Sequence, residues 1–184
     1  MRRFNSSRGH VPSWTIEVED PRCDDVRALL ERHLAFAQAN TPPEDVHALD
    51  LDGLLHPSIT FVALREGSTL LGVGALKELG GAHAEIKSMH TAEVARGRGV
   101  ARALLDHLLA TAGSRGHHRV SLETGATDAF APARALYAGA GFVPCGPFGD
   151  YAESPRSAFM TLELGAGRCG REESNLQEPK PTGT

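Results

Sequence analysis

Apolar residues recur along this chain in two spacings, every second residue in some segments and every third or fourth residue in others. Alternation is typical of half-buried strands, whereas the longer spacing is typical of amphipathic helices. Alternating or short apolar runs predict strands over residues 14–18, 60–65, 69–76, 84–91, 119–123, 142–145 and 158–164. Helical stripes predict helices over residues 24–39, 46–55, 100–112 and 131–140. The resulting order, β-α-α-β-β-β-α-β-α-β-β, predicts an α/β fold with a mixed sheet.

Residues that favour turns and helix ends fall between these segments. The turn at 66–68 contains a glycine and separates two neighbouring strands, which predicts a hairpin. Asp24 or Asp25 can cap the first helix, because a short polar side chain there accepts a hydrogen bond from a free backbone N–H. The last helix is predicted to begin near Pro132 and to end at Gly141.

The folded domain is predicted to span residues 14–164. A length of 184 residues favours a single domain. Residues 1–13 are polar and are expected to form a flexible lead-in. Residues 165–184 contain almost no apolar side chains, so they cannot bury enough surface to offset the entropy that is lost on ordering. We therefore expect a disordered C-terminal tail.

Composition and charge exclude several classes of protein. The formal net charge of −4 and the scattered basic residues argue against a nucleic-acid-binding surface. No apolar run approaches the roughly 20 residues that span a bilayer, and none follows the basic N-terminus as in a secretory signal. The three cysteines, Cys23, Cys145 and Cys169, lack the spacing of a zinc site. We expect a cytoplasmic protein with free thiols, no metal ion, and no nucleic-acid or membrane partner.

A basic, glycine-rich loop from Arg96 to Ala101 lies between the predicted strand 84–91 and the predicted helix 100–112. Glycine lets a backbone approach a ligand closely, and a helix N-terminus presents unpaired N–H groups at the positive end of its dipole. The loop is therefore a candidate phosphate site. It lacks the Gly-Lys-Ser/Thr of a P-loop, and Gly97 and Gly99 lack the third glycine of the dinucleotide-binding motif. Both kinds of nucleotide-binding protein are thus disfavoured.

Three motifs carry a resemblance to a known family. The loop 96–101 fits the pattern Arg/Gln-x-x-Gly-x-Gly/Ala, and Glu85 lies eleven residues before Arg96. Residues 133–142 fit the segment Ala-x-x-Leu-Tyr-x-x-x-Gly-Phe. In this order and spacing the motifs resemble the GNAT superfamily of acyl-CoA N-acyltransferases, over residues 14–164. The resemblance implies the GNAT fold: a central, mostly antiparallel twisted sheet with one splayed parallel pair and helices on both faces.

By this resemblance the protein transfers an acetyl group from acetyl-CoA to a primary amine by direct attack. Tyr137 is implied as the general acid that protonates the leaving thiolate, and Glu85 as the base that takes the amine proton directly or through water. A backbone N–H near Met89 is implied to polarise the thioester carbonyl. Dimers are frequent in this superfamily, so the resemblance allows a homodimer, but the sequence leaves the oligomeric state open. The residues implied to hold coenzyme A are Met89, His90, Thr91, Arg96, Gly97, Arg98, Gly99, Val100, Ala101, Phe130 and Ala133.

Each of these residues has a plainer interpretation beside the functional one. Glu85 is expected to share a strand face with Lys87 and Met89, so it can pair with Lys87 instead of acting as a base. Tyr137 can pack its ring and leave its hydroxyl in solvent. His90 is expected on the opposite face of the strand, as a core or surface residue.

The sequence leaves the acceptor open among polyamines, amino acids, antibiotics, peptide N-termini and lysine side chains. Phe130 stands where many GNAT proteins carry a cofactor-binding asparagine, so packing against the pantetheine arm is expected there. In GNAT proteins the region of the loop 146–155 often borders the acceptor site, where the acidic Asp150 could attract a cationic amine. A plain surface loop is the alternative interpretation. The alternative function is a non-catalytic, acyl-CoA-binding regulatory module, which the presence of both Glu85 and Tyr137 disfavours.

Overall fold

The computed structural model describes residues 13–40 and 51–165. The strands are β1 (Trp14–Val18), β2 (Ile59–Glu66), β3 (Thr69–Gly80), β4 (His83–Thr91), β5 (Arg119–Gly125), β6 (Val143–Pro144) and β7 (Ser157–Glu163). The helices are α1 (Asp24–Asn40), α2 (Leu51–Leu54), α3 (Val100–Ser114) and α4 (Ala131–Gly139), with short 3-10 helices η2 (Glu93–Ala95) and η3 (Asp128–Phe130).

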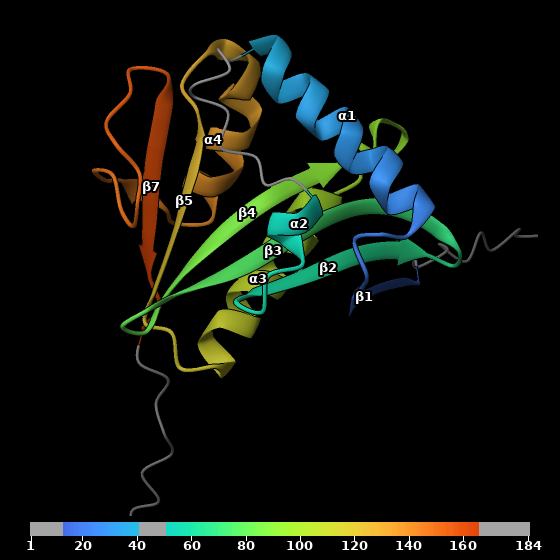
Figure 1. The fold of residues 1–184 in the computed structure, drawn as a ribbon, viewed down its shortest axis with the longest axis horizontal. Coiled ribbons are helices and arrows are strands. Elements are labelled where there is room, and N and C mark those ends of the chain that lie inside the picture. The colour runs from blue at the N-terminus through green and yellow to red at the C-terminus, as the bar shows by residue number, and fades with distance from the viewer. Residues whose placement is uncertain (1–12, 41–50, 166–184) are drawn as a thin grey trace, which may run out of the picture.

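The strands form one seven-stranded sheet in the order β1-β2-β3-β4-β5-β7-β6. Neighbouring strands are antiparallel except for β4 and β5, which run parallel. Helix α1 crosses one face of the sheet, α3 packs on the opposite face, and α4 lies beside β5 (Figure 1). The predicted fold, with a mostly antiparallel sheet, one parallel pair and helices on both faces, is therefore confirmed.

The predicted elements differ from the observed ones mainly at their ends. Strand β3 runs on to Gly80 and forms a second hairpin with β4, which the gap in the apolar pattern after residue 76 did not indicate. Within the predicted helix 46–55, residues 46–50 lie outside the described part of the chain. The same holds for residues 1–12 of the predicted lead-in and residues 166–184 of the predicted tail. Among the helices that the structure describes, none is long and apolar enough to cross a membrane.

Two glycines of β3 let α3 pack closely against the sheet. A Cβ at Gly72 would lie 2.9 Å from Val100 and 3.0 Å from Leu104. A Cβ at Gly74 would lie 3.1 Å from Leu108. The three helix residues are buried and belong to the apolar stripe that the helical spacing predicts. The absence of side chains at these glycines thus sets how closely the start of α3, and the loop before it, approach the sheet.

A β-bulge in β4 changes which side chains share a face of the sheet. Lys87 pairs with Ala75 and His90 pairs with Val73, so two residues of β4 oppose a single residue of β3. Ser88, within the bulge, has a left-handed backbone with φ of 51°. Because Val73 and Ala75 lie on one face of β3, Lys87 and His90 also lie on one face.

The bulge reverses the expected faces of Met89 and His90. His90 lies on the face of the sheet that carries Glu85 and Lys87. Met89 lies on the α3 side, where its Cγ is 3.2 Å from the position that a Cβ would take at Gly74. The expectation that Met89 shares the face of Glu85, with His90 opposite, is therefore wrong. The cause is the extra residue of the bulge, which a strict alternation cannot anticipate.

Strands β4 and β5 pair over four residues, from His83–Arg119 to Ile86–Leu122. Beyond these residues β4 continues to pair with β3, and β5 with β7, up to Thr91 and Gly125 respectively. The sheet is therefore split along this line. Backbone N–H and C=O groups on the two inner edges need partners other than each other.

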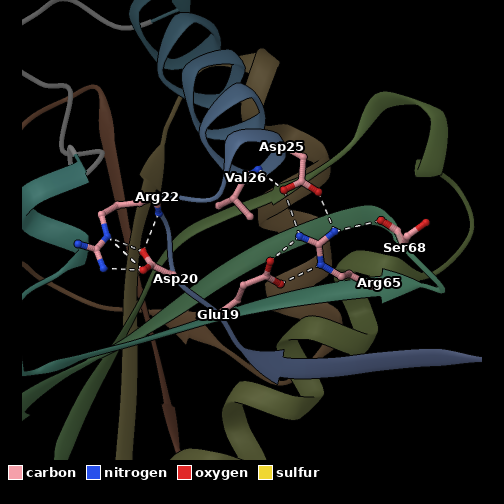
Figure 2. A network of polar contacts seen from close by, with 7 residues as sticks. All are labelled: Glu19, Asp20, Arg22, Asp25, Val26, Arg65 and Ser68. Atoms are coloured by element: carbon pink, nitrogen blue, oxygen red, sulfur yellow. Dashed lines mark hydrogen bonds and ion pairs between the residues drawn. The ribbon is translucent and has the colours of Figure 1, made fainter.

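Arg65 ties the start of α1 to the sheet (Figure 2). Its guanidinium donates to Glu19 at 2.5 and 2.9 Å, to Asp25 at 2.7 and 3.2 Å, and to the Ser68 carbonyl at 3.1 Å. The side chains of Arg65 and Glu19 are each 20% exposed. The hydrogen bonds from Arg65 hold the pKa of Asp25 below its usual value. A planar guanidinium suits this bridging of two carboxylates and fixes the first turn of α1 on β2.

We expect Arg65→Ala to lower the free energy of unfolding by about 2 kcal/mol, because two carboxylates lose their shared cation. Urea denaturation followed by circular dichroism measures the change. Arg22→Ala is the matched control, since its ion pair with Asp20 is exposed and its removal should leave unfolding unchanged. Equal losses in the two variants would contradict the anchoring role of Arg65.

Candidate active site

The split between β4 and β5 opens into a cleft of about 570 Å³. Residues of α1 line one part of it, and residues from η3 and α4 line another. The predicted site residues found on its walls are Glu85, Met89, His90, Thr91, Arg96, Ala101, Phe130, Ala133 and Tyr137. The structure thus brings both candidate catalytic residues together with seven of the eleven candidate coenzyme-binding residues.

The glycine-rich loop leads directly into the N-terminus of α3. Gly97 and Gly99 have φ of 73° and 89°, a left-handed conformation that favours glycine. Gly99 is the N-cap of α3, so the N–H groups of Val100 and Ala101 belong to the first turn and have no partner within the helix. These N–H groups and the helix dipole suit an anion, and Arg96 lines the cleft beside them.

Arg98 has partners of its own outside the cleft lining. Its guanidinium donates to both carboxylate oxygens of Glu66, at 2.9 and 3.0 Å. It also lies 6.0 Å from the centre of the Trp14 ring, within reach of a cation–π contact. Arg98 is therefore engaged with β2 and does not line the cleft, whereas Arg96 does.

Tyr137 is buried at the cleft wall, with its hydroxyl 3.9 Å from the sulfur of Met89. Its ring packs against Phe142 at 5.9 Å between centroids. Burial, and then the negative charge of Glu123, raise the pKa of Tyr137 to about 12. The hydroxyl therefore keeps its proton at neutral pH and can act as a proton donor inside the cleft. The alternative of a solvent-exposed hydroxyl does not hold.

Glu85 and Lys87, which are buried on the cleft wall, form a polar triad with the half-buried Tyr151. Lys87 Nζ lies 3.0 Å from Oε1 of Glu85 and 2.5 Å from the Tyr151 hydroxyl. The Tyr151 hydroxyl donates to the same Oε1 of Glu85 at 2.5 Å. Burial, and then the charge of Glu85, raise the pKa of Tyr151, so this hydroxyl is also protonated. The alternative pairing of Glu85 with Lys87 is thus present, and the pair belongs to the cleft wall.

Two uncharged imidazoles face each other on the same side of the cleft. The rings of His33, from α1, and His90 are 5.0 Å apart. Burial, and then the positive charges of Arg96 and Arg32, lower the pKa of His90 to about 4. Burial also lowers the pKa of His33, whose Nδ1 is buried and finds no hydrogen-bond partner among the described residues. The two rings therefore add polar atoms to the cleft wall without adding charge.

An aromatic pair spans the cleft from α1 to η3. The rings of Phe36 and Phe130 meet edge to face at 5.2 Å between centroids. The Phe130 ring lies directly over Gly125, where a Cβ would come within 2.2 Å of it. Phe130 is thus fixed against the end of β5, and the expectation that it contributes packing rather than a polar contact fits this position.

No sequence pattern predicts that His33, Phe36, Glu123 or Tyr151 belongs to the site or contacts it. For His33 and Phe36 the sequence offers only their place in an amphipathic helix, which does not indicate a cleft. The resemblance to GNAT proteins suggested the loop 146–155 as a border of the acceptor site; in the structure Asp150 is exposed, and Tyr151 contacts Glu85 and Lys87. Tyr151 lies 66 residues from Glu85 along the chain, which explains why no local pattern revealed their contact.

We expect His90→Gln to reduce the loss of stability on acidification. The pKa of His90 is about 4 in the folded protein and 6.5 ordinarily, so unfolding at a pH between these two values is accompanied by uptake of a proton. Its contribution is complete above pH 6.5 and is lost as pH falls towards 4. Wild type should lose about 1 kcal/mol more than the variant between pH 7 and pH 5, after allowance for partial exposure. Urea denaturation at both pH values measures this, with His118→Gln, at an exposed histidine, as the control that should behave like wild type.

Comparison with known proteins gives a consistent family. Residues 25–142 match the model of the acetyltransferase (GNAT) family. The chain is 46% identical over 149 residues to YsnE of Bacillus subtilis, an uncharacterised N-acetyltransferase, with 81% of this chain and 99% of YsnE covered. It is 36% identical over 155 residues to the IAA acetyltransferase of Azospirillum brasilense, with 84% and 100% covered.

A solved structure from Klebsiella pneumoniae, assigned to the acyl-CoA N-acyltransferases, superimposes with a TM-score of 0.68. It is 26% identical and covers 83% of this chain and 99% of its own. An acetyltransferase of Bacillus subtilis in complex with CoA has a TM-score of 0.62 at 18% identity, with 82% and 99% covered, and so shares the fold. The match over residues 25–142, together with the high identity to YsnE over nearly its whole length, shows that this chain belongs to the GNAT family of acetyltransferases.

Proposed function

We propose that this acetyltransferase moves an acetyl group from acetyl-CoA to a primary amine in the cleft between β4 and β5. The observation that carries the proposal is that the protonated hydroxyl of Tyr137 and the carboxylate of Glu85 line the same cleft. The relationship to YsnE, an N-acetyltransferase, supports an amine as the acceptor.

The residues on the α3 side of the cleft fit coenzyme A. Backbone N–H groups in the first turn of α3 and the guanidinium of Arg96 would hold the pyrophosphate. The inner edge of β4 from Met89 to Thr91 would offer backbone groups to the amide-bearing pantetheine arm, as in strand addition. Phe130 and Ala133 would add apolar contact. When bound, acetyl-CoA supplies the acetyl group as a thioester.

Three parts of the chain would then act on the reacting groups. A backbone N–H near Met89, at the bulge, is the candidate donor to the thioester oxygen. Glu85 would accept a proton from the amine, directly or through water, so that the nitrogen can attack. Tyr137 would give its proton to the departing thiolate, which is why its retention of that proton at neutral pH matters.

We expect Tyr137→Phe to lower kcat by about 100-fold or more, because the thiolate loses its proton donor while the ring packing is kept. Thiol release from acetyl-CoA with a panel of primary amines measures the rate. Calorimetric titration with CoA is the control, and the affinity should be close to that of wild type. Unchanged turnover in the variant would remove Tyr137 from this role.

Wild type also tests the proposal as a whole. Tight CoA binding without thiol release on any primary amine would contradict the amine-acceptor reaction and would favour a non-catalytic acyl-CoA-binding module. Failure to bind CoA at all would contradict the assignment of the loop 96–101.

A further inference from the structure

The ion pair between Glu85 and Lys87 is unusual in its location. The two side chains are 2% and 9% exposed, yet both line the cleft. Removing two charges from water is costly, and a buried ion pair often contributes little net stability compared with apolar residues. A pair of opposite charges on the wall of a substrate cleft therefore calls for a role in recognition.

The triad offers complementary charges to a molecule that carries both signs. Glu85 presents a carboxylate that can accept from an ammonium group. Lys87 presents an ammonium, and the Tyr151 hydroxyl lies 2.5 Å from Lys87 Nζ as a second donor. A zwitterion can exchange partners with the internal pair, placing its ammonium on Glu85 and its carboxylate on Lys87 and Tyr151. No charge is then left buried without a partner.

Within the proposed acetyltransferase function, on which this inference rests, we propose that the acceptor is a free α-amino acid with an apolar side chain, held through its ammonium and carboxylate by Glu85, Lys87 and Tyr151. An α-amino acid carries the two charged groups on one carbon, which matches a lysine and a glutamate two residues apart on one face of β4.

The rest of the acceptor side explains the apolar side chain. The rings of His33 and Phe36, from α1, and of His90, from β4, line the same cleft as Glu85 and Lys87. Burial lowers the pKa of both histidines, so these rings are uncharged at neutral pH. An apolar side chain can pack against them, whereas a charged side chain would lose its hydration without gaining an opposite charge from them.

Other amine acceptors fit this wall less well. A polyamine brings additional ammonium groups close to Lys87, which is unfavourable between like charges. A lysine side chain of a protein offers an ammonium but no neighbouring carboxylate. In both cases the ammonium of Lys87 would lose its bond to Glu85 and would receive no new anion in exchange.

The transfer balances with groups that are present. The acceptor ammonium gives one proton to Glu85, and its nitrogen forms the new C–N bond as the C–S bond breaks. The nitrogen loses a second proton on becoming an amide, and the thiolate takes a proton from Tyr137, which regains one in turn. The net release is one proton. The product has no ammonium, so Glu85 returns to Lys87 and the product is no longer held at both ends.

The test compares kcat/KM for apolar amino acids with kcat/KM for analogues that lack the carboxylate. Phenylalanine, leucine and methionine are each compared with their amide and their decarboxylated amine, by thiol release from acetyl-CoA. Spermidine is assayed separately as a polyamine acceptor. We expect at least one amino acid to exceed its own two analogues by roughly 30-fold or more. If amines that lack a carboxylate are preferred, the inference is overturned although the proposed acetyltransferase function stands. Thiol release with none of these amines, nor with any in a wider panel, contradicts both.

Variants connect the preference to the triad. Lys87→Met and Tyr151→Phe should reduce the ratio of kcat/KM for an amino acid to kcat/KM for its analogue. The ratio in each variant is compared with the ratio in wild type, so differences in basicity between the amines cancel. Lys77→Met is the matched control: it removes the same charge from β3, at the position paired with Glu85, and should leave the ratio unchanged. CoA affinity measured by calorimetry shows that each variant is folded. A ratio that stays at the wild-type value in Lys87→Met and Tyr151→Phe would show that the ion pair is structural and would overturn the inference.

Discussion

The early end of pairing between β4 and β5 is the constraint on which the site depends. After Ile86 and Leu122 each strand keeps its outer neighbour, and the inner edges turn towards a cleft instead of towards each other. Buried backbone groups need hydrogen-bond partners, and an extended ligand that carries amides can supply them. The glycine-rich loop follows β4 and the helix with Tyr137 follows β5, so both are delivered to the cleft by the strands that separate.

The parts of this arrangement that the sequence predicted are those encoded by neighbouring residues. Gly97 and Gly99 adopt the left-handed backbone that a tight loop before a helix favours, and the apolar stripe of α3 is a local repeat. The face of His90 was not predictable in this way, because one bulge residue, Ser88, shifts the alternation of every later residue in β4. Tyr151 was missed for a different reason: its contact with Glu85 depends on how a loop far along the chain folds back.

Burial determines the protonation of several groups in the cleft. Tyr137 and Tyr151 keep their protons because a buried tyrosinate anion would be poorly solvated. His33 and His90 stay neutral because a buried imidazolium cation would also be poorly solvated. Arg96 and Glu123 also line the cleft, but Glu85 and Lys87 differ from them in forming a buried pair of opposite charges with a short contact. The same low polarity that makes this pair costly also makes it selective, since unscreened charges act strongly over short distances.

The anchor around Arg65 has a mechanical consequence for the cleft. Phe36 lies eleven residues beyond Asp25 on α1, so the ring is about 16 Å from the anchor along the helix axis. Over such a lever arm, a rotation of about 5° at the anchor moves the ring by about 1.4 Å. Shifts of about 1 Å are enough to misalign reacting groups. The ion network around Arg65 (Figure 2), together with the packing of Val26 and Leu29 in the core, therefore helps to fix the position of one wall of the cleft.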